Sequence, residues 1–484
     1  MESFIQLVTP SNRSEWAGWY SPQRLVDEWI KYNTYKKLKK ETPPATTKKN
    51  VIDCLKHLGL KNAIDRATYY RLYPGEATPC IYGLPKIHKE GAPLRPIVSS
   101  INSVTYNIAK FLATVLAPLF GNTDHHIHNS EDFTAKVRDL ELDTDETMVS
   151  FDITSLFTSI PTTDALTSVK RRLEEESSLS TRTNLSPDQI CLLLDLCLNT
   201  TYFTYRGDKK RHGCAMGSPV SPIVANLYIE EVEKKALNSF PGTTPTHWFR
   251  YADDTWVKIK IQEVQSFTDH INSVDTNISF TREDTKDNRL AFLDCAVIIG
   301  TGGRLEIEVY RKPHTGQYLL FDSHHPLQHK IGVIRTLNHR AQNIPTSIEA
   351  QTKEDRHLKT ALRTCGYPKW AFNKAAPCSR KRTREQSSES QVQRNNLVIP
   401  YMAGVSEKLK RIFRKHNIPV YFTPTNTLRQ RLVHHKDRSP KHNMSNIMYV
   451  VQCSEESSEL YIDETKQLLH RRTVRHQKAS AAGQ

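Results

Sequence analysis

The feature that most constrains this sequence is a pair of adjacent carboxylates at the end of an aromatic, strand-like run. The run reads Phe249-Arg250-Tyr251-Ala252-Asp253-Asp254-Thr255. Because adjacent side chains of a strand point to opposite faces, an acid pair at a strand end or hairpin turn lets one acid face a metal while the other lies beside it. Bare Asp-Asp pairs are common and usually lie on solvated loops, so the rest of the chain has to decide between the two interpretations.

A third acid, Asp152, lies within the run 148–157. Apolar and β-branched residues surround it, and this pattern predicts a buried strand with an acid at its end. Asp152 could cap the following turn or helix. It could also bind a metal, since an acid in an apolar setting is costly unless it is paired or coordinated. Oxygens from Asp152, Asp253 and Asp254 would suit two Mg²⁺ ions, which prefer hard oxygen ligands and clamp the reacting oxygens of a phosphoryl transfer.

Between the two acid sites, the segment 214–227 combines a turn with an apolar run. Gly217 and Pro219 predict the turn, and the residues after it, with Asn226 among them, predict a helix packed on a core. Small residues before such a helix let a base pair approach the backbone closely. An ordinary loop–helix junction is the alternative interpretation.

In this order, the three motifs resemble the palm of a reverse transcriptase. The runs 82–89 (Tyr-Gly-Leu-Pro-Lys-Ile-His-Lys) and 94–99 are similar to the fingers motifs of that family, and the runs 290–294 and 309–315 are similar to its later motifs. The residues of these runs are similar to those of Penelope-like retroelements in particular. The resemblance covers roughly residues 30–365. It implies an α+β fold: a right-hand polymerase palm and fingers with a helical thumb, plus a small truncated α/β nuclease-like C-terminal unit.

The resemblance also implies an activity, the RNA-directed synthesis of DNA by two-metal nucleotidyl transfer. The implied partners are template RNA, a DNA primer or target and dNTPs, and the implied cofactors are two Mg²⁺ ions, for which Mn²⁺ can substitute. The catalytic acids would be Asp152, Asp253 and Asp254, and the metal ligands would be these three and the backbone carbonyl of Ile153.

Further site residues carry over from the resemblance by position. The nucleotide-binding residues would be Lys86, Arg95, Phe157, Gly217 and Ser218, and the primer or template contacts would be Tyr310, Arg311 and Lys312. Arginine offers a fork of donors suited to phosphate and lysine a point charge, although both could be plain surface charge. Phe157 would exclude a ribose 2′-hydroxyl, with core packing as the alternative.

The C-terminal unit resembles part of a GIY-YIG endonuclease. Tyr449 and Tyr461 fall on two strand-like runs, and Arg472 lies where the catalytic arginine of that family is expected. Asp463 replaces the glycine expected in the second strand, and the helix after Arg472 runs out at Gln484. We therefore expect a fragment or degraded copy of a longer element, which binds DNA without nicking it.

Composition agrees with these interpretations. The chain has 484 residues and a formal charge of +15, which favours a polyanionic partner. Its nine cysteines show no CxxC pair or regular spacing, so neither a disulfide scaffold nor a zinc site is indicated.

No apolar run reaches membrane-span length, and the first ten residues lack the features of a signal peptide. We expect an intracellular protein that binds neither a membrane nor a stable protein partner. The basic part of the segment 378–390, at 380–384, is consistent with nuclear import.

The sequence predicts five regions along the chain. They are a polar and helical region at 1–75, fingers and palm at 76–315, a helical thumb-like region at 316–375, a linker at 376–395, and a connector with the partial nuclease domain at 396–484. One rival to an active polymerase is a decayed copy that only binds nucleic acid. Another is a telomerase-like or intron-type reverse transcriptase, which shares the palm.

Overall fold

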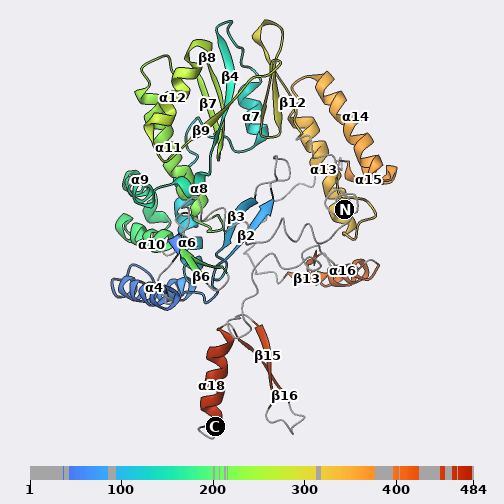
Figure 1. The fold of residues 1–484 in the computed structure, drawn as a ribbon. Coiled ribbons are helices and arrows are strands. Elements are labelled where there is room, and N and C mark those ends of the chain that lie inside the picture. The colour runs from blue at the N-terminus through green and yellow to red at the C-terminus, as the bar shows by residue number, and fades with distance from the viewer. Residues whose placement is uncertain are drawn as a thin grey trace. The chain divides into compact units, whose positions relative to one another are not determined.

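The computed structural model describes residues 36–37, 43–85, 94–199, 202–205, 208–211, 214, 216–311, 318–376, 396–402, 404–423, 447–452, 460–465 and 467–481. They form two compact units that are discontinuous in sequence. The described part of unit 1 lies in 128–144 and 285–433, and that of unit 2 lies in 19–127, 145–284 and 434–484. Helices combine with mainly antiparallel sheets, so the predicted α+β class is confirmed (Figure 1).

A four-stranded antiparallel sheet lies at the centre of the predicted site in unit 2. Its order is β7-β8-β4-β9, and its strands are β4 (Glu146–Ile153), β7 (His247–Tyr251), β8 (Asp254–Lys260) and β9 (Phe280–Asp284). In β4, Met148, Phe151 and Ile153 are buried while Asp152 is exposed at the end of the strand. The buried strand predicted before this acid is therefore confirmed.

Two helices cover one face of this sheet, α11 (Ser221–Ser239) and α12 (Val264–Val274) (Figure 1). The ring of Phe267 in α12 lies 5.7 Å from that of Trp248 and 6.5 Å from that of Phe151. Most residues of α11 are buried, which is typical of a helix packed within a core. The predicted helix after the loop at Gly217 is thus present, and it supports the strands that carry the acids.

A second sheet of unit 2 has the order β1-β6-β5-β2-β3. Its strands are β1 (Lys36–Lys37), β2 (Cys80–Pro85), β3 (Leu94–Ser99), β5 (Tyr202–Tyr205) and β6 (Asp208–Arg211). The accompanying helices are α4 (Pro43–Leu60), α5 (Arg66–Leu72), α6 (Tyr106–Leu116), η1 (Ala117–Leu119), α8 (Leu156–Ser159), α9 (Thr162–Glu175), η2 (Leu179–Thr181), α10 (Pro187–Asn199) and η3 (Ile261–Glu263). One continuous hydrophobic core joins helices α4, α5, α6 and α8 to α12 with the four-stranded sheet.

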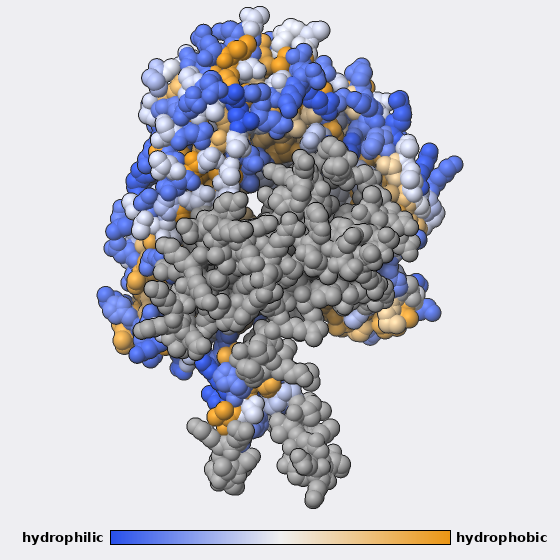
Figure 2. Space-filling view, viewed as in Figure 1, coloured by the Kyte–Doolittle hydropathy of each residue, from blue (hydrophilic) through white to orange (hydrophobic). Residues whose placement is uncertain are grey.

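Unit 1 combines a three-stranded antiparallel sheet, β10-β11-β12, with helices. The elements are α7 (Ser130–Val137), β10 (Arg289–Phe292), β11 (Cys295–Ile299), η4 (Thr301–Gly303), β12 (Leu305–Val309), α13 (Leu327–Asn343), α14 (Ile348–Thr364), α15 (Lys369–Ala375), β13 (Leu397–Pro400), α16 (Ser406–Lys415) and β14 (Val420–Thr423). Strands β13 and β14 are parallel, with α16 as their crossover, and exposed apolar side chains such as Met402 and Ile412 give this region hydrophobic surface (Figure 2).

The C-terminal part of unit 2 is an antiparallel hairpin followed by a helix. Strand β15 (Ile447–Gln452) pairs with β16 (Leu460–Thr465), and α18 (Leu469–Ala481) follows. Both strand-like runs predicted around Tyr449 and Tyr461 are therefore strands. Among all the helices of the described ranges, none is both long and apolar enough to cross a membrane.

Candidate active site

The two adjacent acids lie in a tight hairpin between β7 and β8. Tyr251 pairs with Asp254, so Ala252 and Asp253 alone form the connection. Ala252 has a φ of 54°, in the left-handed region that residues with a Cβ rarely adopt. Ser155, shortly after Asp152, has the same φ. Such backbone strain tends to cluster at functional sites, which is consistent with the predicted role of this sheet end.

Asp152 lies directly opposite Asp254 in the β4–β8 pairing. Directly opposed residues of an antiparallel pair project from the same face, with Cβ atoms about 4.5–5.5 Å apart. The amide of Ile153 donates to the carbonyl oxygen of Asp253 over 3.1 Å, which attaches the turn to the end of β4. The structure therefore brings all three predicted acids to one end of the sheet, and all three are exposed to solvent.

The donors at this end of the sheet fit Mg²⁺ by their chemistry. They are carboxylates and a backbone carbonyl, the hard oxygen ligands that Mg²⁺ prefers. Within the described residues, no three His, Cys, Asp or Glu side chains converge tightly enough to hold a metal by themselves. Mg²⁺ commonly takes only one or two carboxylates and completes its shell with waters and substrate phosphates. The ligand roles of Asp152, Ile153, Asp253 and Asp254 stay predictions.

The loop at Gly217 is packed against β3. The amide of Val98 donates to the carbonyl of Met216 over 2.9 Å, and the Ser100 hydroxyl donates to the carbonyl of Gly217 over 2.8 Å. Gly217 has a φ of 124°, and a Cβ at this position would lie 2.3 Å from the carbonyl oxygen of Val98. The close approach of β3 thus requires a glycine at position 217. The nucleotide contact of Gly217 and Ser218 is a separate prediction.

The family described as "Reverse transcriptase (RNA-dependent DNA polymerase)" matches residues 87–288, a range that includes the three acids and the Gly217 loop. These residues form a reverse transcriptase domain. The predicted domain is therefore confirmed at the level of the family, whereas the Penelope-like subtype and the GIY-YIG resemblance stay predictions. Residues 317–376 match a second family, described as "Animal helix-turn-helix domain", which the sequence analysis did not anticipate.

Similar solved structures include polymerases of two kinds. Telomerase from Candida albicans in complex with a telomeric RNA fragment shows 12% identity and a TM-score of 0.43 over 62% of this chain and 55% of that one. Apo telomerase from Candida tropicalis shows 11% identity and a TM-score of 0.43, covering 75% and 65%. The 3Dpol RNA-dependent RNA polymerase of a Sicinivirus shows 12% identity and a TM-score of 0.38, covering 57% and 60%.

The chain spans less than two-thirds of the length of these telomerases. At these TM-scores, the similarity adds no support of its own to the assignment, which rests on the sequence family. No curated protein sequence matches the chain.

The predicted nucleotide-binding residues of the reverse transcriptase domain are described to different extents. Phe157 is half-buried in the short helix α8 and packs against the core of the unit. Arg95 lies in β3, opposite Leu84, but its side chain is outside the described part. Lys86 and Lys312 lie outside the described residues altogether. The structure therefore allows Phe157 a packing role and a role at an exposed edge, and it leaves the phosphate contacts as predictions.

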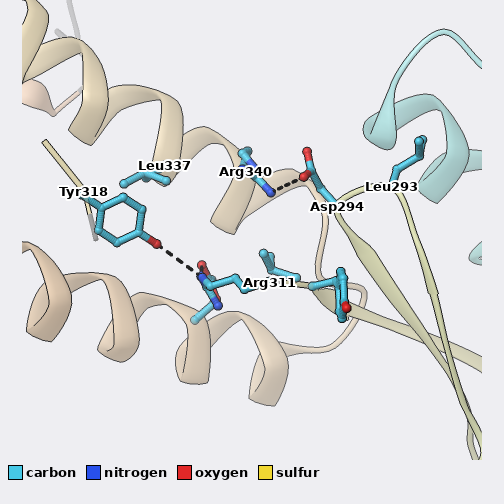
Figure 3. A pocket seen from close by; sticks show the side chains of 9 residues that line it. Leu293, Asp294, Arg311, Tyr318, Leu337 and Arg340 are labelled. Carbon is cyan, nitrogen blue, oxygen red and sulfur yellow. Dashed lines mark hydrogen bonds and ion pairs between the residues drawn. The ribbon is translucent and has the colours of Figure 1, made fainter. Parts of the chain in front are cut away.

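Tyr310 and Arg311 line a pocket of about 220 Å³ in unit 1 (Figure 3). Arg311 forms an ion pair with Glu354 and donates from Nε to the Tyr318 hydroxyl over 3.4 Å. Across the pocket, Arg340 pairs with Asp294 at 2.9 Å. The side chain of Glu354 is 8% exposed, so its charge depends on Arg311 for compensation. The structure thus gives Arg311 a partner within the protein, in addition to its predicted primer contact.

We expect Arg311→Leu to lower the free energy of unfolding by about 1–3 kcal/mol, because it leaves the Glu354 carboxylate without its ion pair in a mostly buried position. Denaturant titration of the purified chain measures this loss. The matched control is Arg304→Leu, which breaks the exposed Arg304–Glu141 pair of the same unit and should cost less than about 1 kcal/mol. Unchanged stability with weakened primer binding would instead assign Arg311 to the primer alone.

Four polar side chains converge in the C-terminal part of unit 2. The Tyr449 hydroxyl donates to Asp463 over 2.9 Å, accepts from Nε of Arg472 over 2.9 Å, and lies 2.6 Å from Nε2 of His476. Arg472 also pairs with Asp463 at 2.7 Å. Partial desolvation raises the pKa of the Tyr449 hydroxyl above its ordinary value. The side chain of Tyr461 is outside the described part.

One group of residues near the acids was missed by the sequence analysis. Three glutamates of α11, Glu230, Glu231 and Glu233, are buried, and Arg250 of β7 is 2% exposed. Glu231 pairs with Arg171, and the other two glutamates face Arg250. The available signal was the placement of acids in an apolar helix, because buried charges require a partner.

Proposed function

We propose that this chain is an RNA-directed DNA polymerase that copies template RNA into DNA by extending a DNA primer with dNTPs. The observation that carries the proposal is the convergence of Asp152, Asp253 and Asp254 at one sheet end of a reverse transcriptase domain. The basic net charge supports binding to a nucleic acid. Template recognition would rest on A-form shape, phosphates and 2′-hydroxyls.

The residues of the hairpin end would perform distinct tasks. Asp152 and Asp253, with Asp254 and the Ile153 carbonyl beside them, would hold two Mg²⁺ ions. When bound, these ions stabilise the charge that develops on the reacting phosphate and activate the primer 3′-hydroxyl. Phe157 would lie under the sugar of the incoming nucleotide, and the Gly217 loop would hold β3 close to α11 beside the nascent base pair.

A primer-extension assay tests the proposal. The purified chain, Mg²⁺, dTTP and an oligo(dT) primer on poly(A) should give extended products. The competing proposal is a decayed copy that only binds nucleic acid, and the three acids on one sheet end argue against it. Tight binding of the primer–template without any extension, in Mg²⁺ and in Mn²⁺, would favour the decayed copy.

We also propose the narrower assignment to Penelope-like retroelements and a nuclear site of action. The subtype is supported by the wording of the runs 82–89 and 309–315 and by the Tyr449–Arg472 cluster beside two strands. A telomerase-like or intron-type enzyme remains the alternative and shares the reverse transcriptase domain. Extension of a nicked duplex end, compared with extension of a free single-stranded end, distinguishes insertion into a target from end elongation. The basic run 380–384, which lies outside the described residues, supports nuclear import, and fluorescence microscopy of the tagged chain tests it.

For the C-terminal part of unit 2, we propose DNA binding without cleavage. Asp463 pairs with Arg472 and accepts from Tyr449, so its carboxylate takes the partners that a scissile phosphate would need. Arg471 is also paired, with Glu76 at 3.3 Å, which makes Arg475 the more available cation of these three. Binding should still weaken with salt, because cations of the helix would contact phosphates.

We expect the purified chain to leave supercoiled plasmid intact in Mg²⁺. Asp463→Gly should strengthen DNA binding severalfold, because it removes a negative charge and releases Arg472. Gel analysis of the plasmid and fluorescence anisotropy of labelled DNA measure the two results. Mg²⁺-dependent nicking that is lost in Arg472→Ala but kept in Asp253→Asn would show an active nuclease and refute this proposal.

A further inference from the structure

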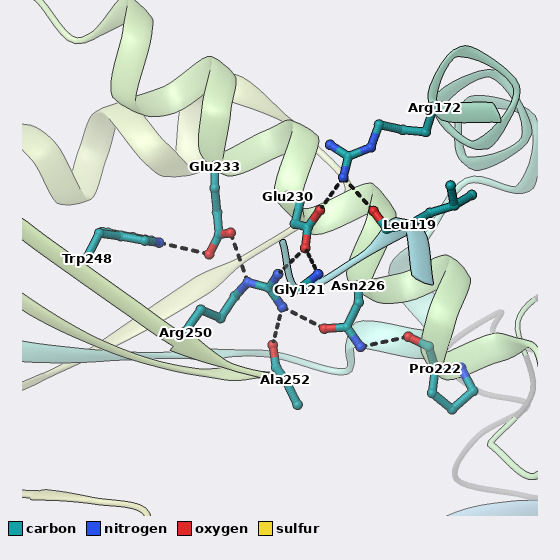
Figure 4. Close-up of polar contacts among 10 residues, drawn as sticks. All are labelled: Leu119, Gly121, Arg172, Pro222, Asn226, Glu230, Glu233, Trp248, Arg250 and Ala252. Carbon is teal, nitrogen blue, oxygen red and sulfur yellow. Dashed lines mark hydrogen bonds and ion pairs between the residues drawn. The ribbon is translucent and has the colours of Figure 1, made fainter. Parts of the chain in front are cut away.

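Arg250 contacts the acid hairpin from within the core of unit 2. It lies in β7, is 2% exposed, and uses both edges of its guanidinium (Figure 4). Its Nε donates to Glu233 over 2.8 Å. Its Nη1 donates to the side-chain oxygen of Asn226 over 2.7 Å and to the backbone carbonyl of Ala252 over 3.1 Å. One rigid planar group therefore joins helix α11 to the turn that carries Asp253.

The carbonyl of Ala252 belongs to the peptide that joins Ala252 to Asp253. The next peptide is held as well, because the Asp253 carbonyl accepts from the amide of Ile153 over 3.1 Å. Peptide groups are planar and stiff. Fixing the peptide on each side of Asp253 therefore fixes the direction in which its side chain leaves the backbone. The φ of 54° at Ala252 makes such support necessary, since an alanine does not hold this conformation by preference.

The position of Arg250 is itself strongly determined. Its backbone amide donates to the carbonyl of His125 over 2.7 Å, and its carbonyl accepts from Ile127 over 2.9 Å. On the side-chain side, Glu233 also accepts from the Trp248 indole over 2.9 Å, so the carboxylate that faces Arg250 has two donors. The guanidinium therefore has little freedom to leave the turn.

A second glutamate balances the charge of this group. Glu230 lies 3.7 Å from Arg250, accepts from the amide of Gly121 over 2.9 Å, and pairs with Arg172 of α9 at 3.1 Å. Arg172 also donates to the carbonyl of Leu119 over 2.6 Å (Figure 4). Two arginines and two glutamates thus form a neutral set, which is the condition under which buried charges are tolerated.

We propose that Arg250 is a positioning residue that holds the Ala252–Asp253 peptide and thereby aims Asp253 at the metal ions of the polymerase reaction. The inference rests on the proposed function and names a residue that acts on it from within the core. A purely structural role would require only a buried positive charge opposite Glu233 and Glu230. Lysine supplies that charge, but its single ammonium cannot reproduce the planar fork that reaches Glu233, Asn226 and Ala252 together.

Arg250→Lys in the full chain separates the two roles. We expect kcat for primer extension to fall about 10- to 100-fold, because small displacements of a reacting group are costly, while KM for dNTP changes less than about twofold. The Mn²⁺ concentration for half-saturation, measured by electron paramagnetic resonance on the chain with primer–template, should rise severalfold. The matched control is Arg172→Lys, the same exchange at the other arginine of the charged set. Arg172 pairs with Glu230 but contacts neither the β7–β8 hairpin nor the three proposed catalytic aspartates. Its kcat and Mn²⁺ binding should stay at the parent values.

Parent-like kcat and Mn²⁺ binding in Arg250→Lys, or equal losses in Arg172→Lys, would assign Arg250 to charge balance in the core and overturn the inference. If Arg250→Lys does not fold by circular dichroism, Asn226→Ser takes its place. It removes one acceptor of Nη1 without changing any charge and should shift kcat and Mn²⁺ binding in the same direction. A parent chain that binds Mn²⁺ but never extends primers would refute the polymerase proposal, and the Mn²⁺ comparison would still decide the role of Arg250.

Discussion

Asp253→Asn is expected to reduce Mg²⁺-dependent dNTP incorporation by about 10³-fold or more, the largest effect of any substitution considered. The amide keeps the shape of the side chain but removes the charge that a metal ligand supplies, and charge stabilisation in the transition state depends on it. Asp253 is exposed in the β7–β8 turn, and its backbone bond with Ile153 does not involve the carboxylate. Folding and template binding should therefore stay close to those of the parent chain.

Rates of primer extension over a Mg²⁺ titration, with template binding measured by fluorescence anisotropy, check this result. Asp145→Asn is the matched control, because Asp145 is an exposed acid that precedes β4 at the other end of the sheet and pairs with Lys260 at 2.6 Å. Loss of that surface pair should leave the extension rate unchanged. Extension at the parent rate by Asp253→Asn would show that the acid hairpin is not the catalytic site.

Local sequence patterns predicted the elements of this site well. The buried strand β4 that ends near Asp152, the hairpin between β7 and β8, and helix α11 after Gly217 all lie where the motifs placed them. These features depend on short-range chemistry: apolar periodicity, turn residues and the position of an acid at a strand end. The order of the motifs then indicated the reverse transcriptase family, which the match over 87–288 confirms.

Contacts between distant segments could not be predicted in the same way. The requirement for Gly217 comes from the carbonyl of Val98, more than a hundred residues earlier in the chain. No role was assigned to Arg250 from the sequence, because its role depends on two glutamates that reach it only when α11 packs on the sheet. A single sequence does not show which residues of a helix face which residues of a strand. The buried set of two arginines and two glutamates is therefore visible only in the tertiary structure.

Phe157→Val should increase the use of rNTPs relative to dNTPs by roughly 10- to 100-fold, because a smaller side chain leaves room for a 2′-hydroxyl. Phe157 lies in α8, five residues after Asp152, and is half-buried against the core. A residue that blocks the sugar needs this arrangement, with one side of the ring held by packing and the other reaching the nucleotide. Single-nucleotide incorporation with matched dNTP and rNTP gives the ratio of kcat/KM values.

The neighbouring residue separates sugar choice from general damage to the core. Leu156 is buried beside Phe157 in the same helix, so Leu156→Val should lower the free energy of unfolding by about 1 kcal/mol without changing the preference for dNTPs. If Phe157→Val also loses stability but keeps the parent preference while it remains active, the ring belongs to the core alone. A shift in sugar choice in Phe157→Val and not in Leu156→Val would require the exposed edge of the ring to contact the nucleotide.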